Sequence, residues 1–227
     1  MAPRGSSRSR PTKRRPEAPD LPDELAQAPA VVEGGELWDC VEAGAAVQVP
    51  ERVADLRIQE SRWVGGNLAG SRFTGLECRD VEFVHCDLSG ARLEEAVLTR
   101  VVFTDCRLTG AGFDGSQLTD VRITDSTADL AGFRMAKARF LLVENTSLHG
   151  ADLFEFDAEH CALLGCDLAE ASFDAARLRE TDLHGSTVDD VRGVLSLRGA
   201  RISPDQIIPL ATGLLDAVGI QVTEQPP

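Results

Sequence analysis

The chain has 227 residues, with 37 acidic and 23 basic side chains and a formal net charge of −14. This charge disfavours general binding of nucleic acid, because contacts to phosphates need a basic surface. The chain has no apolar stretch of about 18 residues to span a membrane, no apolar signal segment behind the basic N-terminus, no tyrosine and only four histidines. We therefore expect a cytoplasmic, non-enzymatic protein without metal or cofactor, whose six cysteines stay reduced.

Residues 1–30 are rich in proline, serine, alanine and charge and lack a hydrophobic pattern, so we expect a disordered tail. The simplest interpretation of its basic start is a solvated terminus, and the alternatives are an electrostatic tether to nucleic acid or to the acidic body of the protein. Residues 31–52, which include Trp38 and Val47, are expected to cap the domain that follows. The basic side chains of residues 1–16 are Arg4, Arg8, Arg10, Lys13, Arg14 and Arg15.

The body of the chain follows a five-residue repeat. It runs for 27 blocks without a gap, from the block whose third residue is Ile58 to the block whose third residue is Val188. Typical blocks read CDLSG at 86–90, CRLTG at 106–110 and TDLHG at 181–185. The third place is large and apolar, the first place is mostly small, and none of these 54 positions carries a charge. Both places therefore face a core. A period of five residues matches neither the period of a helix nor that of a strand.

A fixed period of five with two inward places fits a chain that turns a corner every five residues, so that four sides make a coil of 20 residues. Coils stacked about 4.8 Å apart would make about seven coils and a rod roughly 32 Å long across residues 53–200. Residues 20 apart should then stack in columns. One expected column is Trp63, Phe83, Phe103, Ile123, Val143, Leu163 and Leu183.

One stretch of the repeat admits two registers. In the strict count, Leu130, Met135 and Phe140 face outward while two alanines face inward. A shift by two residues would bury larger side chains and would require a bulge or loop within residues 126–145. Without the shift, the outward side chains form an apolar strip that could cover the N-terminal segment or meet a partner.

Residues 201–227 are expected to form a helical cap and tail. Ser203 is suited to the N-cap, Pro204 to the first turn and Gln206 to the third helical position, and Gly219 can end the helix. The apolar face of this helix is expected to cover the last coil and to offer a homodimer interface. Its members are Ile207, Ile208, Leu210, Leu214, Leu215 and Val218.

The repeat resembles the A-(D/N)-L-x-x signature of the pentapeptide-repeat family. This resemblance implies an all-β fold, a right-handed quadrilateral β-helix with a C-terminal helical cap. The acidic rod and its C-terminal elements also resemble the quinolone-resistance branch from actinobacteria, whose members look like DNA to gyrase and dimerise end to end. The resemblance implies a DNA mimic that binds DNA gyrase or topoisomerase IV and modulates quinolone sensitivity, although the long N-terminal tail departs from that branch.

Surface charge is the feature that points to a partner. Residues 140–190 hold 12 acids and two bases on about 12 Å of axis, which approaches the charge density of duplex DNA. A general scaffold with an unrelated protein partner is the alternative, because aspartate belongs to the repeat signature, and nucleic-acid binding through residues 1–16 is a third hypothesis. The candidate interaction surface consists of Glu144, Asp152, Glu155, Asp157, Glu159, Asp167, Glu170, Asp174, Asp182, Asp189 and Asp190.

Histidine and cysteine are not expected to build a catalytic or metal site. The four histidines occupy outward places in four different columns, whereas metal ligands must converge. Cys86, Cys106 and Cys166 share one inward column, which is typical of small buried apolar side chains.

Overall fold

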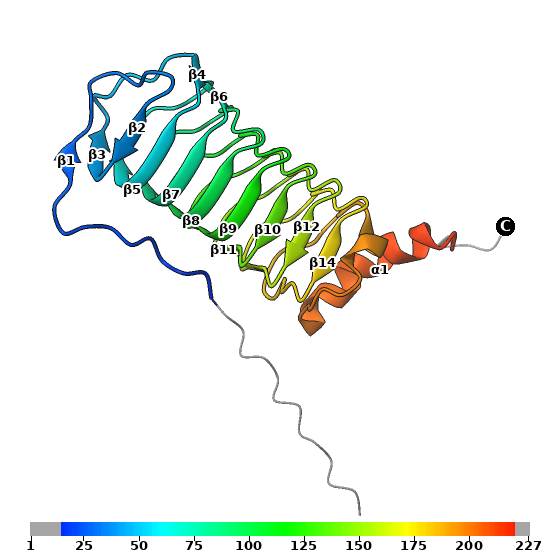
Figure 1. Ribbon diagram of the computed structural model, residues 1–227. Helices are drawn as coiled ribbons and strands as arrows, with labels where there is room; N and C mark the ends of the chain where they lie inside the picture. The colour runs from blue at the N-terminus through cyan, green and yellow to red at the C-terminus, as the bar shows by residue number, and fades with distance from the viewer. Residues whose placement is uncertain (1–14, 221–227) are drawn as a thin grey trace, which may run out of the picture.

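The computed structural model, which describes residues 15–220, is a rod of stacked parallel strands with a short helix at its C-terminal end (Figure 1). Four long strands turn a corner and cover two sides of the rod: β5 (Arg57–Val64), β7 (Glu77–Val84), β8 (Val97–Thr104) and β9 (Gln117–Thr124). The short strands are β1 (Ala26–Gln27), β2 (Leu37–Asp39), β3 (Val41–Gly44), β4 (Arg52–Ala54), β6 (Arg72–Thr74), β10 (Lys137–Arg139), β11 (Leu142–Glu144), β12 (Asp157–Glu159), β13 (Ala162–Leu164) and β14 (Arg177–Arg179).

The strands of the body pair in parallel with a step of 20 residues. Trp63 pairs with Phe83, and Phe83 pairs with Phe103. The other two sides keep the same step through isolated bridges, such as the one between Asn67 and Asp87. These four ladders confirm the predicted four-sided coil of 20 residues and the solenoid of about seven coils.

The fifth residue of every block turns the chain through a left-handed backbone conformation. From Asp55 to Asp190, each of these residues has a φ angle between 44° and 71°. Glycine adopts this conformation without strain, aspartate and asparagine adopt it more readily than other residues, and any other side chain costs roughly 1–2 kcal/mol. The corner requirement therefore explains why glycine and aspartate recur at the fifth place.

The strict register holds through the ambiguous stretch. Ala128 and Ala138 are buried, whereas the side chains of Leu130 and Met135 are 66% and 52% exposed. The shifted register, with its bulge or loop, is therefore wrong. Phe140 also occupies an outward corner, yet it is only 8% exposed and its ring stacks on His160 at 5.4 Å.

Aromatic side chains fill the core as a ladder along the rod. The ring centroids of Trp38 and Trp63 lie 5.3 Å apart, those of Trp63 and Phe83 lie 6.0 Å apart, and those of Phe83 and Phe103 lie 5.0 Å apart. In the block whose third residue is Ala158, the first residue is Phe156, which is 1% exposed and fills the space that a larger third residue occupies elsewhere. The core thus keeps its density by exchanging large and small residues within a coil.

The N-terminal end differs in part from the expected cap at residues 31–52. Trp38 pairs with Ile58 in the 20-residue step of the body, so this segment forms a further coil rather than a separate cap. The chain just before this segment closes the end together with it, because β1 pairs with β3 and the side chains of Ala28 and Val32 are buried.

The expectation of disorder up to residue 30 is wrong for residues 16–30, while residues 1–14 lie outside the described part of the chain. We call residues 16–25 the arm; it runs along the outside of the long strands (Figure 1). The backbone N–H of Glu17 donates to Asp120, and that of Asp20 donates to Asp80. The composition of this segment could not predict these contacts, because they join the arm to residues 60 or more positions away.

The C-terminal cap begins as the sequence predicts. The backbone N–H of Ser203 donates to Oε1 of Gln206 at 2.8 Å, and Gly219 follows the helix with a φ of 78°. Nε2 of Gln206 donates to the carbonyls of Leu183 and Ser186, at 2.8 and 2.6 Å, and so satisfies the open edge of the last coil. The helical elements are η1 (Val194–Leu197), η2 (Pro204–Gln206) and α1 (Ile207–Ala217).

Candidate interaction surfaces

The acidic residues that the sequence singled out between 140 and 190 are divided among the four sides of the rod. Four of them share one side and its corner: Asp167, Glu170, Asp189 and Asp190. Three lie on the next side, namely Asp152, Glu155 and Asp174, and the others lie on the two long-strand sides, namely Glu144, Asp157, Glu159 and Asp182.

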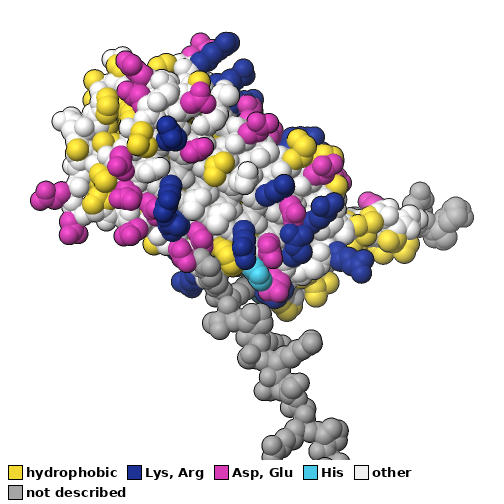
Figure 2. All heavy atoms as spheres, viewed as in Figure 1, with side chains coloured by type: hydrophobic (Ala, Val, Ile, Leu, Met, Phe, Trp, Pro, Cys, Tyr) yellow, Lys and Arg dark blue, Asp and Glu magenta, His cyan; other side chains and the backbone are white. Residues whose placement is uncertain are grey.

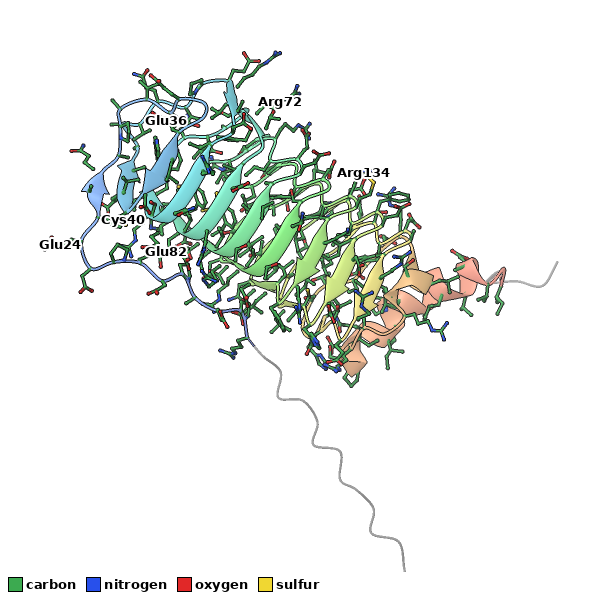
Figure 3. All side chains as sticks on the ribbon, in the orientation of Figure 1. Glu24, Glu36, Cys40, Arg72, Glu82 and Arg134 are labelled. Carbon is green, nitrogen blue, oxygen red and sulfur yellow. The ribbon has the colours of Figure 1, made fainter. Side chains whose placement is uncertain are left out.

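Several acids outside the first group are matched by a basic neighbour. Arg134 contacts Asp152 at 2.6 Å, and Arg179 contacts Asp157 at 2.8 Å. Figure 3 shows Arg134 on the edge of the rod opposite the arm. Such pairs add little stability at the surface, but they cancel the local field that a basic partner would sense.

One side of the rod carries a continuous row of acids, which we call the acidic stripe. Consecutive coils stack along this side through bridges from Asp87 to Arg107 and onward in steps of 20 residues. Arg107 is the one arginine or lysine in the row between 85 and 190, and His85 and His149 also lie in it, His85 near Asp105 and His149 near Asp167 and Glu170. Four members of the row precede residue 140, and they were missed because charge was counted along the chain rather than by column. The stripe consists of Asp87, Asp105, Asp125, Asp129, Asp167, Glu170, Asp189 and Asp190.

The carboxylates of the acidic stripe face solvent. The side chains of Asp167 and Glu170 are 44% and 66% exposed. Desolvation acts against the charge of Asp87, but hydrogen bonds from Ser89 and Arg107 hold the pKa of Asp87 below its usual range. The stripe is therefore a charged surface at neutral pH.

A second set of charged groups lies at the corner that the arm covers. Asp80 and Asp120 are only 3% and 5% exposed. Nε and Nη2 of Arg100 donate to the two carboxylate oxygens of Asp80, at 2.6 and 2.5 Å. Burial opposes the charge of Asp80, but the hydrogen bonds from Arg100 and from the Asp20 N–H lower its pKa overall. This corner is a buried ionic network instead of an open charged surface.

The C-terminal end of the rod is apolar. Of the helix residues predicted for a cap or dimer interface, Leu210 is buried and Leu215 is half-buried, whereas Ile207 and Ile208 are 57% and 82% exposed. Leu214 and Val218 are also exposed, and Figure 2 shows hydrophobic side chains gathered on α1. A groove of about 380 Å³ lies beside α1, lined by Val194, Leu195, Leu197, Arg198, Ala200, Ile202, Leu210 and Leu214.

A thiolate is unfavourable at most of the cysteines, although a hydrogen bond with Cys106 lowers the pKa of Cys86. Burial raises the pKa of Cys78 to about 12 and, as the largest effect, that of Cys161 to about 11. Among the described residues, one group of metal-ligand type has its atoms within 4.8 Å of one another, namely Asp39, Cys40 and Glu60. Desolvation and the two carboxylates raise the pKa of Cys40, so this thiol is a weak nucleophile and a poor ligand at neutral pH.

The repeat, its register and its left-handed corners define a class of protein. Two family profiles match the chain: "Pentapeptide repeat region" over residues 56–133 and "Pentapeptide repeats (8 copies)" over residues 146–185. Together they cover just over half of the sequence. The protein belongs to the pentapeptide-repeat family, whose members generally act as structural or interaction modules.

Solved structures with detectable similarity have low identity and low TM-scores. A structure of trypsin-treated QnrB1, described as a plasmid-mediated fluoroquinolone resistance protein, is 20% identical with a TM-score of 0.36, covering 83% of this chain and all of that one. HetL, a pentapeptide-repeat protein of the cyanobacterium Nostoc involved in heterocyst differentiation regulation, is 16% identical with a TM-score of 0.26, covering 73% and 86% of the two chains. No curated protein matches the sequence. Within residues 15–220, no helix has the length and hydrophobicity to cross a membrane.

Proposed function

We propose that this protein is a non-enzymatic, cytoplasmic interaction module that presents its acidic stripe to a basic groove of a protein partner. A groove built to hold DNA is the kind of surface that this stripe fits. The particular partner we propose is a type II topoisomerase, DNA gyrase or topoisomerase IV, with an effect on quinolone sensitivity.

The spacing of charge along the acidic stripe carries this proposal. Eight acids and one arginine lie along a side that spans five steps between stacked coils, from Asp87 to Thr187. At about 4.8 Å per step, the net charge amounts to roughly one negative charge per 3 Å. One strand of duplex DNA carries one phosphate per about 3.4 Å. The stripe therefore offers a partner a charge spacing close to that of a DNA strand.

The apolar end surface supports a homodimer in the same proposal. Ile207, Ile208 and Val218 are exposed beside the groove at α1. Two copies that join through this end would bury these side chains and place two stripes on one longer rod. Light scattering at tens of micromolar tests this: we expect the mass of a dimer for the natural protein and of a monomer for Ile208→Asp.

A general scaffold with an unrelated partner is the second candidate, and the mixed charge of the other sides favours it. The side of β10, β12 and β14 carries Lys137, Arg139, Arg177 and Arg179 among its acids, so it lacks the uniform sign of the stripe. Binding of nucleic acid through residues 1–16 is the third candidate, and those residues lie almost entirely outside the described chain.

Gyrase supercoiling, titrated with the protein in the presence and absence of a fluoroquinolone, tests the proposal. We expect inhibition or protection from the drug at micromolar protein. The variant Asp167→Lys/Glu170→Lys/Asp189→Lys should lose this effect at least 10-fold, because it breaks the stripe at three of its exposed members. Its matched control is Glu95→Lys/Glu155→Lys/Asp174→Lys, which changes the same charge on the neighbouring side.

The two variants separate the outcomes. An effect lost only in the stripe variant supports mimicry of DNA. An equal loss in both variants shows that net charge alone matters and contradicts the role of the stripe. No effect of the natural protein at tens of micromolar rejects gyrase as the partner and leaves the general scaffold.

A further inference from the structure

The arm approaches the rod with a period of three residues. Pro16 and Ala28 are buried, and Pro19, Pro22 and Leu25 are half-buried, while most of the residues between them are exposed. A polyproline II helix has three residues per turn, so this pattern turns the same edge of the arm toward the rod at each step. Prolines at every third position also limit the conformational freedom that the arm loses when it docks.

Two hydrogen bonds show that the spacing of residues along the arm matches the spacing of coils along the rod. The N–H of Glu17, which follows Pro16, donates to Oδ1 of Asp120 at 3.0 Å. The N–H of Asp20, which follows Pro19, donates to Oδ1 of Asp80 at 3.1 Å. Three residues of polyproline II advance about 9.3 Å, and two coils of the rod advance about 9.6 Å. A segment with proline at every third residue therefore presents one free N–H to every second coil.

The acceptor site is assembled by the rod itself. Arg100 holds the carboxylate of Asp80 through two hydrogen bonds, and these do not involve the arm. With the arm in place, the side chain of Asp80 is 4% exposed and that of Arg100 is 23% exposed, and the two hydrogen bonds from Arg100 hold the carboxylate in position. A site that is formed before its ligand arrives needs little reorganisation to bind.

One contact between the arm and the rod is incomplete. Besides the two N–H bonds, Nη2 of Arg122 donates to the carbonyl of Pro16 at 3.5 Å. Nε of Arg122 is buried without a hydrogen-bond partner among the described residues. Most residues of the arm are exposed, as in the less stable parts of a fold, and Nε of Arg122 can form a further hydrogen bond with a better-placed carbonyl.

We propose that this corner of the rod is a binding site for extended segments with proline at every third residue, filled here by residues 16–22 of the same chain. A partner segment of the same chemistry exchanges with the arm. The site is separate from the acidic stripe, so its existence does not depend on the partner of the stripe.

The test uses the full chain and a synthetic peptide. The variant Pro16→Gly/Pro19→Gly/Pro22→Gly weakens the arm, because glycine adds freedom that docking must remove. The probe is a fluorescein-labelled peptide with the sequence of residues 15–25, and its binding is followed by fluorescence anisotropy. We expect the arm variant to bind the probe at least 10-fold more tightly than the natural protein, in which the tethered arm competes at a high effective concentration.

A second substitution in the arm variant locates the site. Asp120→Ala should weaken the binding of the probe roughly 10-fold, because it removes a charged acceptor. Asp125→Ala is the matched control, since it removes an exposed acid of the same coil outside the corner, and it should change the affinity less than about twofold. Circular dichroism checks that each variant keeps the fold.

Hydrogen exchange of the natural protein gives an independent readout. The amides of Glu17 and Asp20 should exchange more slowly than those of Ala18 and Leu21, because the first two are bonded to the rod. Equal binding of the probe by the natural protein and the arm variant, no binding by either, or no effect of Asp120→Ala would overturn the proposal. Four amides that exchange at the rate of a free chain would also overturn it.

Discussion

Two regions of this rod use the same repeat position in opposite ways. Asp125 and Asp190 occupy left-handed corners of the acidic stripe, with φ angles of 51° and 52°, and both are exposed. Asp80 and Asp120 occupy equivalent corners at the arm, with φ angles of 57° and 55°, and both are buried. Backbone geometry selects aspartate at both places, and the neighbours in the next coil decide its role.

The neighbours differ in one respect that matters for function. At the arm, Arg100 and two backbone N–H groups compensate the carboxylates, which allows them to be buried. Along the stripe, eight acids face one arginine and two histidines, so most of the charge remains exposed to water and available to a partner. A repeat that places acids at its corners thus yields a binding surface only on the side that lacks matching cations.

The largest expected effect comes from comparing the removal of one arginine at the arm with the removal of one arginine at the acidic stripe. Arg100→Ala leaves the buried carboxylate of Asp80 without its two donors and should lower the free energy of unfolding by about 3 kcal/mol. Arg107→Ala is the matched change on the stripe, where Arg107 meets Asp87 at 3.3 Å and both side chains are largely open to water. It should cost less than about 1 kcal/mol. Urea unfolding measures both, and equal effects would contradict the distinction between the two regions.

Glycine at the two kinds of corner should act in opposite directions. Leu130→Gly relieves a left-handed residue that is 66% exposed, and it should stabilise the protein by about 1 kcal/mol. Phe140→Gly relieves the same strain but loses a ring that is 8% exposed, and it should destabilise the protein by about 2 kcal/mol. Thermal unfolding compares the two variants. A loss of stability in Leu130→Gly would show that this side chain is buried in solution, for example at an interface.

The smallest expected effect is a dependence on pH at the arm. The pKa of Asp80 is lowered in the folded protein, so its charge stabilises the fold above the unfolded pKa of about 3.9. This contribution is lost as the pH falls through the lower folded pKa. The groups that face it are Arg100, Arg79 and the N–H of Asp20.

The variant Asp80→Asn isolates this contribution. The difference in unfolding free energy between the natural protein and the variant should be largest above about pH 4 and should shrink as the pH is lowered further. Asp125→Asn, at an exposed corner of the stripe, should differ little from the natural protein at neutral pH. A difference for Asp80→Asn that does not change with pH would show that its charge does not contribute.

Much of the fold could be predicted from the repeat alone. The third places from Ile58 to Val188 are buried without exception, because a five-residue step leaves one large inward position on each side. The register between residues 126 and 145 could not be decided, since side-chain size alone favoured burial of Leu130 and Met135. The left-handed corner decides it, because a shift by two would move the corner away from every neighbouring block.

The candidate site was predictable only in outline. The acids from Glu144 to Asp190 were found, but the stripe begins at Asp87 and excludes Asp152 and Asp157, which have basic neighbours. Counting by columns of 20 residues would have found the row. The contacts of the arm were not predicted, although its prolines recur at every third residue. A polyproline pattern does not indicate which surface the segment packs against.

By itself, the sequence determined the coil of 20 residues, the inward positions and the start of the C-terminal helix at Ser203. These follow from local geometry and from the separation of apolar and polar places, which a periodic chain repeats at every step. Only the tertiary structure decided which acids are paired, which are buried and where the arm lies. Those outcomes depend on groups that are distant along the chain and adjacent in space, and the electrostatic free energy of a charge depends on such neighbours.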